Sequence, residues 1–275
     1  TLRNDAGDSA TWPFVVRPNS PRQPCAVLLP TLTWRAYGGN RRNFTWTEDA
    51  VLDAGLCLYD LHADGSLVTL TSCRRPTRSG TPFSGFANWG PHLLTADLYL
   101  LDWLEHEAIG YDVLADEHLD AEGLGAIESY RCLILGAHPE YATAAMLDAL
   151  EQYLAQGGRL IYPGGNGLYW VTSIDGERPH LIEVRKSAPG EFPEDGAPEP
   201  GETEHQTTLQ PGGLWEVQGR PPSRILGLAH SANRHDPVAP GSGYMRTADG
   251  RDARWEWVFD GVETEPFGET GLTLG

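Results

Sequence analysis

The sequence lacks any apolar run of about 18 or more residues, so it predicts no membrane-spanning helix. Its first residues, 1–8, are polar and do not resemble a signal peptide. There is no initiator Met, and the chain ends abruptly at Gly275. We therefore expect this chain to be part of a larger polypeptide or of a multi-subunit enzyme.

Cysteine and positive charge are both scarce. The four cysteines, Cys25, Cys57, Cys73 and Cys132, have no CxxC spacing, which argues against zinc or a disulfide framework and favours a reducing cytoplasm. Cys25 and Cys132 border apolar runs, so we expect both to be buried. The chain has 20 Lys and Arg against 38 Asp and Glu, and its net charge is −18. Such a surface repels phosphate, so neither nucleic acid nor an anionic membrane is an expected partner.

Several well-known catalytic motifs are also missing. The sequence has no GxSxG or GxCxG nucleophile elbow, no GxGxxG fingerprint after a strand and no HExxH. The turn Gly165-Asn166-Gly167 occupies the place of a nucleophile elbow, but its central residue is an amide. An amide is a poor nucleophile, yet it can donate a hydrogen bond to a developing oxyanion.

Hydrophobic periodicity predicts an α/β protein. Helices are expected at 97–108 and 140–156, with a short helical or loop segment at 116–126. Alternation of strands and helices with short links predicts a mostly parallel open sheet flanked by helices, in a single domain over 1–275. The expected strands of this sheet are 25–30, 111–115, 132–136 and 159–163.

Other segments show weaker patterns. The patterns predict an edge strand at 12–18, a loop insertion at about 38–92 with a hairpin around 62–65, an exposed flap at about 186–213, and strand-like Trp-rich pieces at 214–217 and 255–259.

The most informative motif is His138-Pro139-Glu140-Tyr141, directly after a predicted strand. Ligands of open α/β sheets bind at the carboxyl ends of the strands. With Pro139 near the first helical position, we expect Glu140 in the first helical turn, where the helix dipole favours an ionised carboxylate. Glu140 is then a general base, a metal ligand or merely a capping acid. His138 is equally compatible with catalysis and with an ordinary loop.

Three predicted strand ends should converge on one edge of the sheet. The polar residues that this convergence would bring together are Tyr37, His138, Glu140, Tyr141, Asn166 and Tyr169. Among them, tyrosines such as Tyr141 and Tyr169 are more often packing residues than ligands.

Four blocks of the sequence, 29–37, 110–113, 136–141 and 157–170, have a specific order and spacing, with weaker support from 220–222 and 257–261. In these blocks the chain resembles the large (beta) subunit of N,N-dimethylformamidase, in its C-terminal catalytic domain. The resemblance implies a class I glutamine-amidotransferase-like, flavodoxin-like fold. It also implies a small accessory subunit and an oligomer of the large subunit.

The resemblance further implies a mononuclear iron centre, Fe(III), held by two tyrosines and one glutamate. Carried over, the ligands are Tyr37, Tyr59 and Glu140, and Tyr141 and Tyr169 compete with Tyr59 for the second phenolate. The segment 38–58 departs from the family pattern, which bears on this choice. Phenolate and carboxylate oxygens are hard donors that suit a ferric ion.

The implied activity is hydrolysis of a small N-substituted formamide, such as N,N-dimethylformamide to dimethylamine and formate, by metal-activated water. His138 neighbours the metal ligand and is a candidate acid, and Asn166 is the polarising amide. Glu256 or Asp260 is a candidate for a further catalytic carboxylate. Trp34, Trp170 and Phe267 are candidates for a small apolar pocket around the N-methyl groups.

Two other hypotheses compete with this one. An amidotransferase-like fold can serve as a non-catalytic binding or structural domain, because fold does not determine function. A metal-free hydrolase could instead use Glu140 as the base and Asn166 as the oxyanion donor.

Overall fold

The computed structural model describes residues 2–7, 9–10, 13–38, 56–75, 80–82, 91–186, 202–229 and 245–261. The chain divides into two compact units, Thr1–His230 and Ser231–Gly275. A single catalytic domain over the whole chain stays a prediction. In the described part of the chain, none of the helices combines the length and apolar character needed to cross a bilayer.

The first unit holds most of the secondary structure. Its strands are β1 (Leu2–Arg3), β2 (Ser9–Ala10), β3 (Cys25–Leu29), β4 (Leu70–Ser72), β5 (Tyr111–Ala115), β6 (Cys132–Leu135), β7 (Tyr141–Ala142), β8 (Arg159–Ile161), β9 (Trp170–Val171), β10 (Ser173–Ile174) and β11 (Leu181–Glu183). Its helices are α1 (Thr31–Tyr37), α2 (Leu94–His106), α3 (Asp116–Glu122), the 3-10 helix η2 (Gly123–Ala126), α4 (Ala144–Ala155) and α5 (Ser223–Leu226). The second unit contains the 3-10 helices η3 (Asp249–Arg251) and η4 (Ala253–Phe259).

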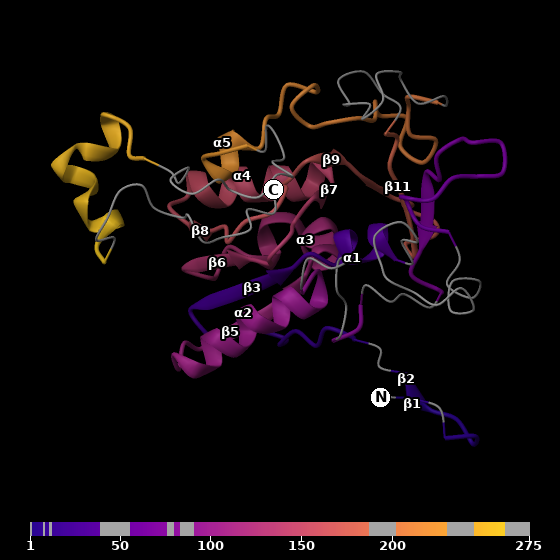
Figure 1. Ribbon diagram of the computed structural model, residues 1–275, viewed down its shortest axis with the longest axis horizontal. Coiled ribbons are helices and arrows are strands. Elements are labelled where there is room, and N and C mark those ends of the chain that lie inside the picture. The colour runs from indigo at the N-terminus through magenta and orange to yellow at the C-terminus, as the bar shows by residue number, and fades with distance from the viewer. Residues whose placement is uncertain are drawn as a thin grey trace. The chain divides into compact units, whose positions relative to one another are not determined.

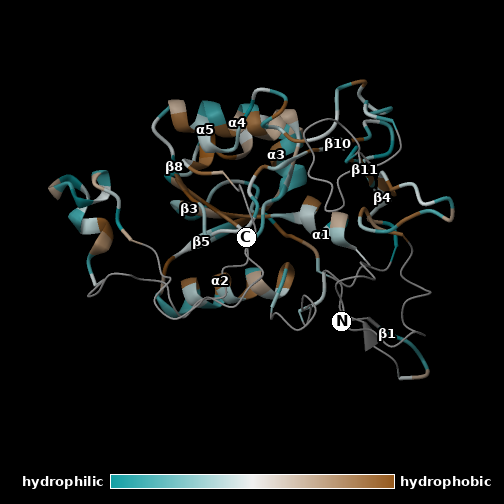
Figure 2. Ribbon diagram, turned by 45° about the horizontal axis from the view of Figure 1, so that its top comes forward, coloured by the Kyte–Doolittle hydropathy of each residue, from teal (hydrophilic) through white to brown (hydrophobic). Residues whose placement is uncertain are grey.

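A four-stranded parallel sheet in the order β5-β3-β6-β8 forms the centre of the first unit. Figures 1 and 2 show α3 and α4 on one side of this sheet and α2 on the other. Strands covered on both faces are apolar throughout. Accordingly, Val27, Leu28, Leu133 and Ile134 of the two central strands are all buried. The predicted parallel sheet flanked by helices is confirmed.

The strand order predicts where the ligand crevice of this sheet should lie. The chain runs from β3 to β5 on one side and then returns past β3 to β6 on the other side. The connections after β3 and β6 therefore diverge, and doubly wound sheets bind their ligands at such a switch point. α1 follows β3 directly, and the segment 136–141 follows β6 directly.

Two predicted boundaries at this crevice differ from the structure. The strand predicted to end at Pro30 ends one residue earlier, at Leu29, and residues 31–37 form α1. The helix predicted from 140 begins only at Ala144, where the Thr143 hydroxyl caps it by accepting a hydrogen bond from Met146 N at 3.2 Å. Glu140 thus precedes β7 and lies outside the helix. Neither a first-turn helix dipole nor a capping role applies to it.

Other local predictions had mixed outcomes. The turn at 62–65 is confirmed by hydrogen bonds from His62 N to Ser66 O and from Gly65 N to His62 O. Three predicted strands are absent from the described residues. The described part of segment 12–18 is irregular, and residues 214–217 form a turn after one isolated bridge. Residues 255–259 lie in the 3-10 helix η4. All four cysteines are free, but Cys25 and Cys132 are partly exposed at the starts of adjacent strands.

Candidate active site

Helix α1 supplies two polar side chains to the crevice. Thr33 and Tyr37 are four residues apart and therefore lie on the same face of the helix. The Thr33 hydroxyl accepts hydrogen bonds from the backbone N–H groups of Glu140 at 3.1 Å and Tyr141 at 3.4 Å. These bonds fasten the segment after β6 to α1 and fix where Glu140 enters the crevice.

The short parallel pair β7-β9 fixes the Glu140 side chain from the other direction. Tyr141 pairs with Trp170 in this ladder, and Tyr169 N donates to Glu140 O at 2.8 Å. The Trp170 indole Nε1 donates to Glu140 Oε1 at 3.0 Å. The Glu140 residue is only 3% exposed, so its carboxylate is held in a buried, oriented position.

Three phenols surround this carboxylate. The Tyr59 hydroxyl lies 3.3 Å from both Oε1 and Oε2 of Glu140. The Tyr141 hydroxyl shares a hydrogen bond with the Tyr59 hydroxyl at 2.8 Å, and the rings of Tyr37 and Tyr59 are 4.3 Å apart between centroids. Thus Tyr37, Tyr59 and Glu140, which are widely separated in sequence, lie in one cluster, and Tyr141 lies directly beside it.

Burial and charge both make these phenols hard to ionise. Burial is the largest cause that raises the pKa of Tyr37, Tyr59 and Tyr141 well above its ordinary value, and the negative charge of Glu140 is the second. Hydrogen bonds to Tyr59 and Glu140 raise the pKa of Tyr37 further. A bound cation would reverse this electrostatic preference, because it favours the anionic form of each ligand.

Two histidines extend the cluster. His138 Nε2 lies 3.3 Å from Glu140 Oε2, and His138 Nδ1 lies 3.0 Å from His92 Nε2. Burial, and then the nearby His138, lower the pKa of His92 to about 3, so His92 stays neutral. His92 was missed from the sequence, because it lies in an aperiodic stretch where nothing distinguishes it from a surface histidine.

Lys186 is the second residue that the sequence interpretation missed. Its ammonium Nζ lies over the Tyr59 ring, 3.6 Å from the centroid, and 5.0 Å from the centroid of Trp170. Lys186 begins the segment that the sequence predicts to be an exposed flap, so no pattern marked it as buried.

The turn after β8 approaches the same histidine. A Cβ added to Gly165 would lie 2.8 Å from a ring carbon of His138 and 2.9 Å from the Ala137 carbonyl oxygen. Asn166, which is partly exposed, follows this glycine in the turn. The Tyr169 ring packs edge-on against Trp170, with 5.2 Å between centroids.

The predicted residues near the C-terminus belong to the second unit. Glu256 is exposed and forms an ion pair with Arg246 at 3.3 Å. Asp260 follows η4, and Phe267 lies outside the described residues. A catalytic role for Glu256 or Asp260, and a pocket role for Phe267, stay predictions.

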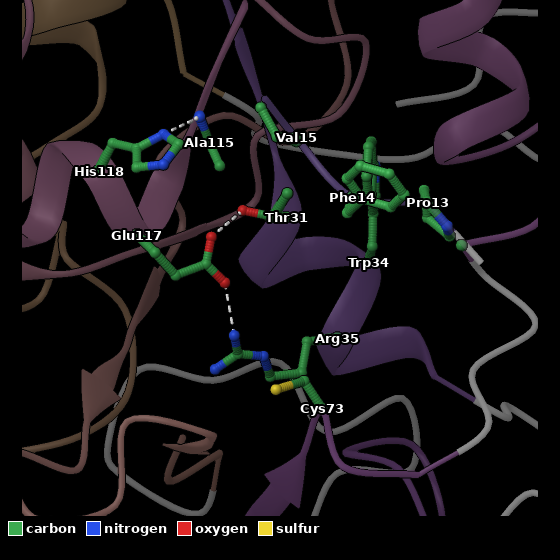
Figure 3. A pocket seen from close by; sticks show the side chains of 11 residues that line it. Pro13, Phe14, Val15, Thr31, Trp34, Arg35, Cys73, Ala115, Glu117 and His118 are labelled. Carbon is green, nitrogen blue, oxygen red and sulfur yellow. Dashed lines mark hydrogen bonds and ion pairs between the residues drawn. The ribbon is translucent and has the colours of Figure 1, made fainter. Parts of the chain in front are cut away.

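A separate pocket of about 300 Å³ lies against another face of α1, lined by Trp34, Arg35 and residues from α3 and the N-terminal segment. Figure 3 shows Glu117 reaching between Thr31 and Arg35, to which it is hydrogen-bonded at 2.5 Å each, with Phe14 beside Trp34. Two charged side chains of this pocket, Arg35 and Glu117, are thus paired with each other. The Trp34 indole turns to the buried Asp97, donating to Oδ2 at 2.9 Å.

The donor set of the tyrosine cluster restricts the metals that it could hold. Across the described ranges, no group of three or more His, Cys, Asp or Glu side chains could bind a metal ion. A metal in this crevice would therefore depend on phenol oxygens together with Glu140. Anionic oxygen donors of this kind fit a hard cation and not a soft one.

Comparison with known proteins decides the family. The family model for "N,N-dimethylformamidase beta subunit-like, C-terminal" matches residues 1–274. The chain belongs to this family.

Two relatives agree with this membership. The N,N-dimethylformamidase beta subunit of Paracoccus aminophilus is 39% identical over 226 residues, and that of an Alcaligenes species is 38% identical over 226 residues. Each alignment covers 80% of this chain and 28% of the relative. The aligned part of the chain therefore spans less than a third of the length of these relatives.

Proposed function

We propose that this chain carries the catalytic centre of an iron-dependent amidohydrolase. Its substrate would be N,N-dimethylformamide or a similarly small N-substituted formamide, cleaved to an amine such as dimethylamine and to formate. The observation that carries the proposal is the buried convergence of Tyr37, Tyr59 and Glu140 at the switch point of the sheet. The names of the two relatives support the substrate.

The residues present fit the implied iron. Two phenols and a carboxylate lie together in this buried cluster, and burial together with the charge of Glu140 opposes the loss of the two phenol protons, a preference that a bound cation would reverse. Three anionic oxygen ligands would offset the three positive charges of Fe(III), which makes a ferric ion the best match to this donor set. Tyr37, Tyr59 and Glu140 would hold it. Tyr141, whose hydroxyl contacts that of Tyr59, is the alternative to Tyr59 as the second phenolate ligand.

Iron, when bound, would polarise the formyl oxygen and lower the pKa of a bound water. The other requirement is a proton for the nitrogen, because the C–N bond breaks as the water oxygen joins the formyl carbon. His138 would supply it, and its surroundings support this role: one ring nitrogen faces Glu140 and the other faces the neutral His92.

The remaining residues would orient the substrate. Asn166, at the turn beside His138, would donate a side-chain hydrogen bond to the formyl oxygen as negative charge develops there. Trp170, whose indole contacts Glu140, would present an apolar surface to the N-methyl groups. The relatives are named beta subunits, which supports the further proposal of a small accessory subunit and an oligomeric enzyme.

The test combines metal analysis with a product assay. The purified protein should contain iron, show a phenolate-to-iron charge-transfer band and release dimethylamine and formate from N,N-dimethylformamide. Tyr37→Phe and Glu140→Ala should lose both iron and activity. A colourless, iron-free preparation with full activity that chelators do not inhibit would contradict the iron proposal and favour a metal-free hydrolase.

A further inference from the structure

Lys186 is the only lysine among the 20 basic residues of the chain; every other one is arginine. It lies at the candidate active site and is only 8% exposed. Burying an ammonium group is costly unless nearby groups compensate its charge. Both the choice of lysine over arginine and its burial therefore call for a reason at this position.

Three aromatic rings provide part of that compensation. The Lys186 ammonium lies 3.6 Å from the ring centroid of Tyr59, 5.0 Å from that of Trp170 and 5.6 Å from that of Tyr141. Attraction between a cation and a ring face acts over such distances. A compact ammonium concentrates its charge at one point, whereas a guanidinium spreads it over a plane. The nearest ring belongs to a proposed metal ligand.

The backbone before Lys186 is firmly held, so this placement is not that of a loose surface chain. Val184 N donates to Thr69 O at 2.9 Å, and Gly213 N donates to Arg185 O at 2.8 Å. The Arg185 side chain points to the buried Glu183, with 2.5 Å between Nη2 and Oε1. The two neighbouring side chains thus have different partners: Arg185 pairs with Glu183, and the Lys186 ammonium lies over the Tyr59 ring.

Lys186 brings a positive charge to a cluster of negative ligands. Tyr37, Tyr59 and Glu140 would carry three negative charges as metal ligands, which Fe(III) already offsets, so Lys186 would give the loaded site a net positive charge. A cation at 3.6 Å from the Tyr59 ring also lowers the energy of the electrons in that ring. The ring would then donate electron density to a bound metal less strongly.

We propose that Lys186 is a positioning residue that acts through Tyr59, setting how strongly this ligand donates to the metal and how much positive charge the site carries. The inference rests on the proposed iron site. It adds a residue outside the ligand set that controls the electronic properties of the centre.

The experiment compares the iron-loaded wild-type protein with Lys186→Met, Lys186→Gln and Lys186→Arg. Removal of the cation raises the energy of the Tyr59 electrons, so both neutral variants should shift the charge-transfer band to longer wavelength. They should also lower the reduction potential of the iron and keep at least the wild-type iron content, because a positive charge near a metal cation opposes binding. Lys186→Arg should restore the wild-type band and potential in large part.

The outcomes separate the two proposals. A wild-type protein without iron and without the band overturns the proposed function. A wild-type protein with the band, whose neutral variants show an unchanged band and potential, overturns only the role of Lys186. Loss of iron from both neutral variants also overturns that role, since it would make Lys186 a structural support for the ligands. The Met and Gln variants differ in polarity. If one of them fails to fold, the band and the reduction potential of the other still test the role of Lys186.

Discussion

The hydroxyl of Tyr59 lies at the same distance, 3.3 Å, from both carboxylate oxygens of Glu140, although 81 positions separate the two residues. The Tyr141 hydroxyl reaches only as far as Tyr59, at 2.8 Å. This geometry favours Tyr59 over Tyr141, the sequence neighbour of Glu140, as the second phenolate of the proposed site.

The choice of second ligand can be tested with a matched pair of variants. Tyr59→Phe should lose most of the bound iron and the charge-transfer band, because it removes a hydroxyl that faces the carboxylate. Tyr141→Phe should retain iron, because its hydroxyl contacts another phenol. Elemental analysis and visible absorption of both variants decide the question. Retained iron in Tyr59→Phe with loss in Tyr141→Phe would reverse the assignment.

The charge of Glu140 can be measured through its effect on the phenols. In metal-free protein, Glu140→Gln should lower the pKa of the buried tyrosines, because the carboxylate charge is the second-largest cause that raises it. Burial remains, so the pKa should stay above its ordinary value. Ultraviolet absorbance against pH measures this ionisation. Glu128→Gln, at an exposed position, is the control and should leave the curve unchanged.

His92 should matter for turnover and not for metal binding. Loss of the hydrogen bond that orients a functional imidazole typically lowers activity about 10- to 100-fold. His92→Phe should therefore reduce kcat within this range, because His138 Nδ1 loses its partner at 3.0 Å. The iron content should remain at the wild-type level. An unchanged kcat would show that His92 only fills space.

Gly165 should tolerate no side chain. Its φ of 79° strains other residues, and an added Cβ would meet the His138 ring and the Ala137 carbonyl below 3.0 Å. Gly165→Ala should therefore lower the free energy of unfolding by about 1–3 kcal/mol. It should also reduce activity through displacement of His138. Gly176→Ala, where a Cβ meets nothing within 4 Å, is the matched control for denaturant unfolding.

Asp97 should make stability depend on pH. Its burial raises the pKa of the carboxyl group to about 7 in the folded protein, although bonds from Ala137 N and the Trp34 indole oppose this shift. Below about pH 4 both folded and unfolded states are protonated, so the group has no effect there. Between about pH 4 and 7 only the unfolded state releases the proton, so the free energy of unfolding falls as pH rises.

The matching variant is Asp97→Asn, which cannot titrate. Its free energy of unfolding should fall less between about pH 4 and 7 than that of the wild type, by a few kcal/mol. Asp102→Asn changes an exposed acid on the same helix and should keep the wild-type dependence. Equal slopes for Asp97→Asn and the wild type would show that Asp97 ionises normally in the folded state.

The sequence alone determined the central sheet and one half of the site. The runs at 25–29, 111–115, 132–135 and 159–161 are short and apolar between turn signals, and buried parallel strands require that pattern. The motif at 138–141 falls at the end of such a strand, which placed His138 and Glu140 correctly at the crevice. The predicted helix start was wrong because the Thr143 hydroxyl caps the helix, so its first turn begins at Ala144 and not beside Pro139.

Only the tertiary structure decided which distant residues join this motif. Tyr59, His92 and Lys186 come from segments without periodicity or from the end of a strand, and their positions depend on long-range packing against Glu140 and His138. Hydrophobic patterns report which face of an element is buried, but they contain no information on which loops meet above a sheet. The sequence thus supplied the carboxylate, and the fold supplied the phenols, the second imidazole and the ammonium around it.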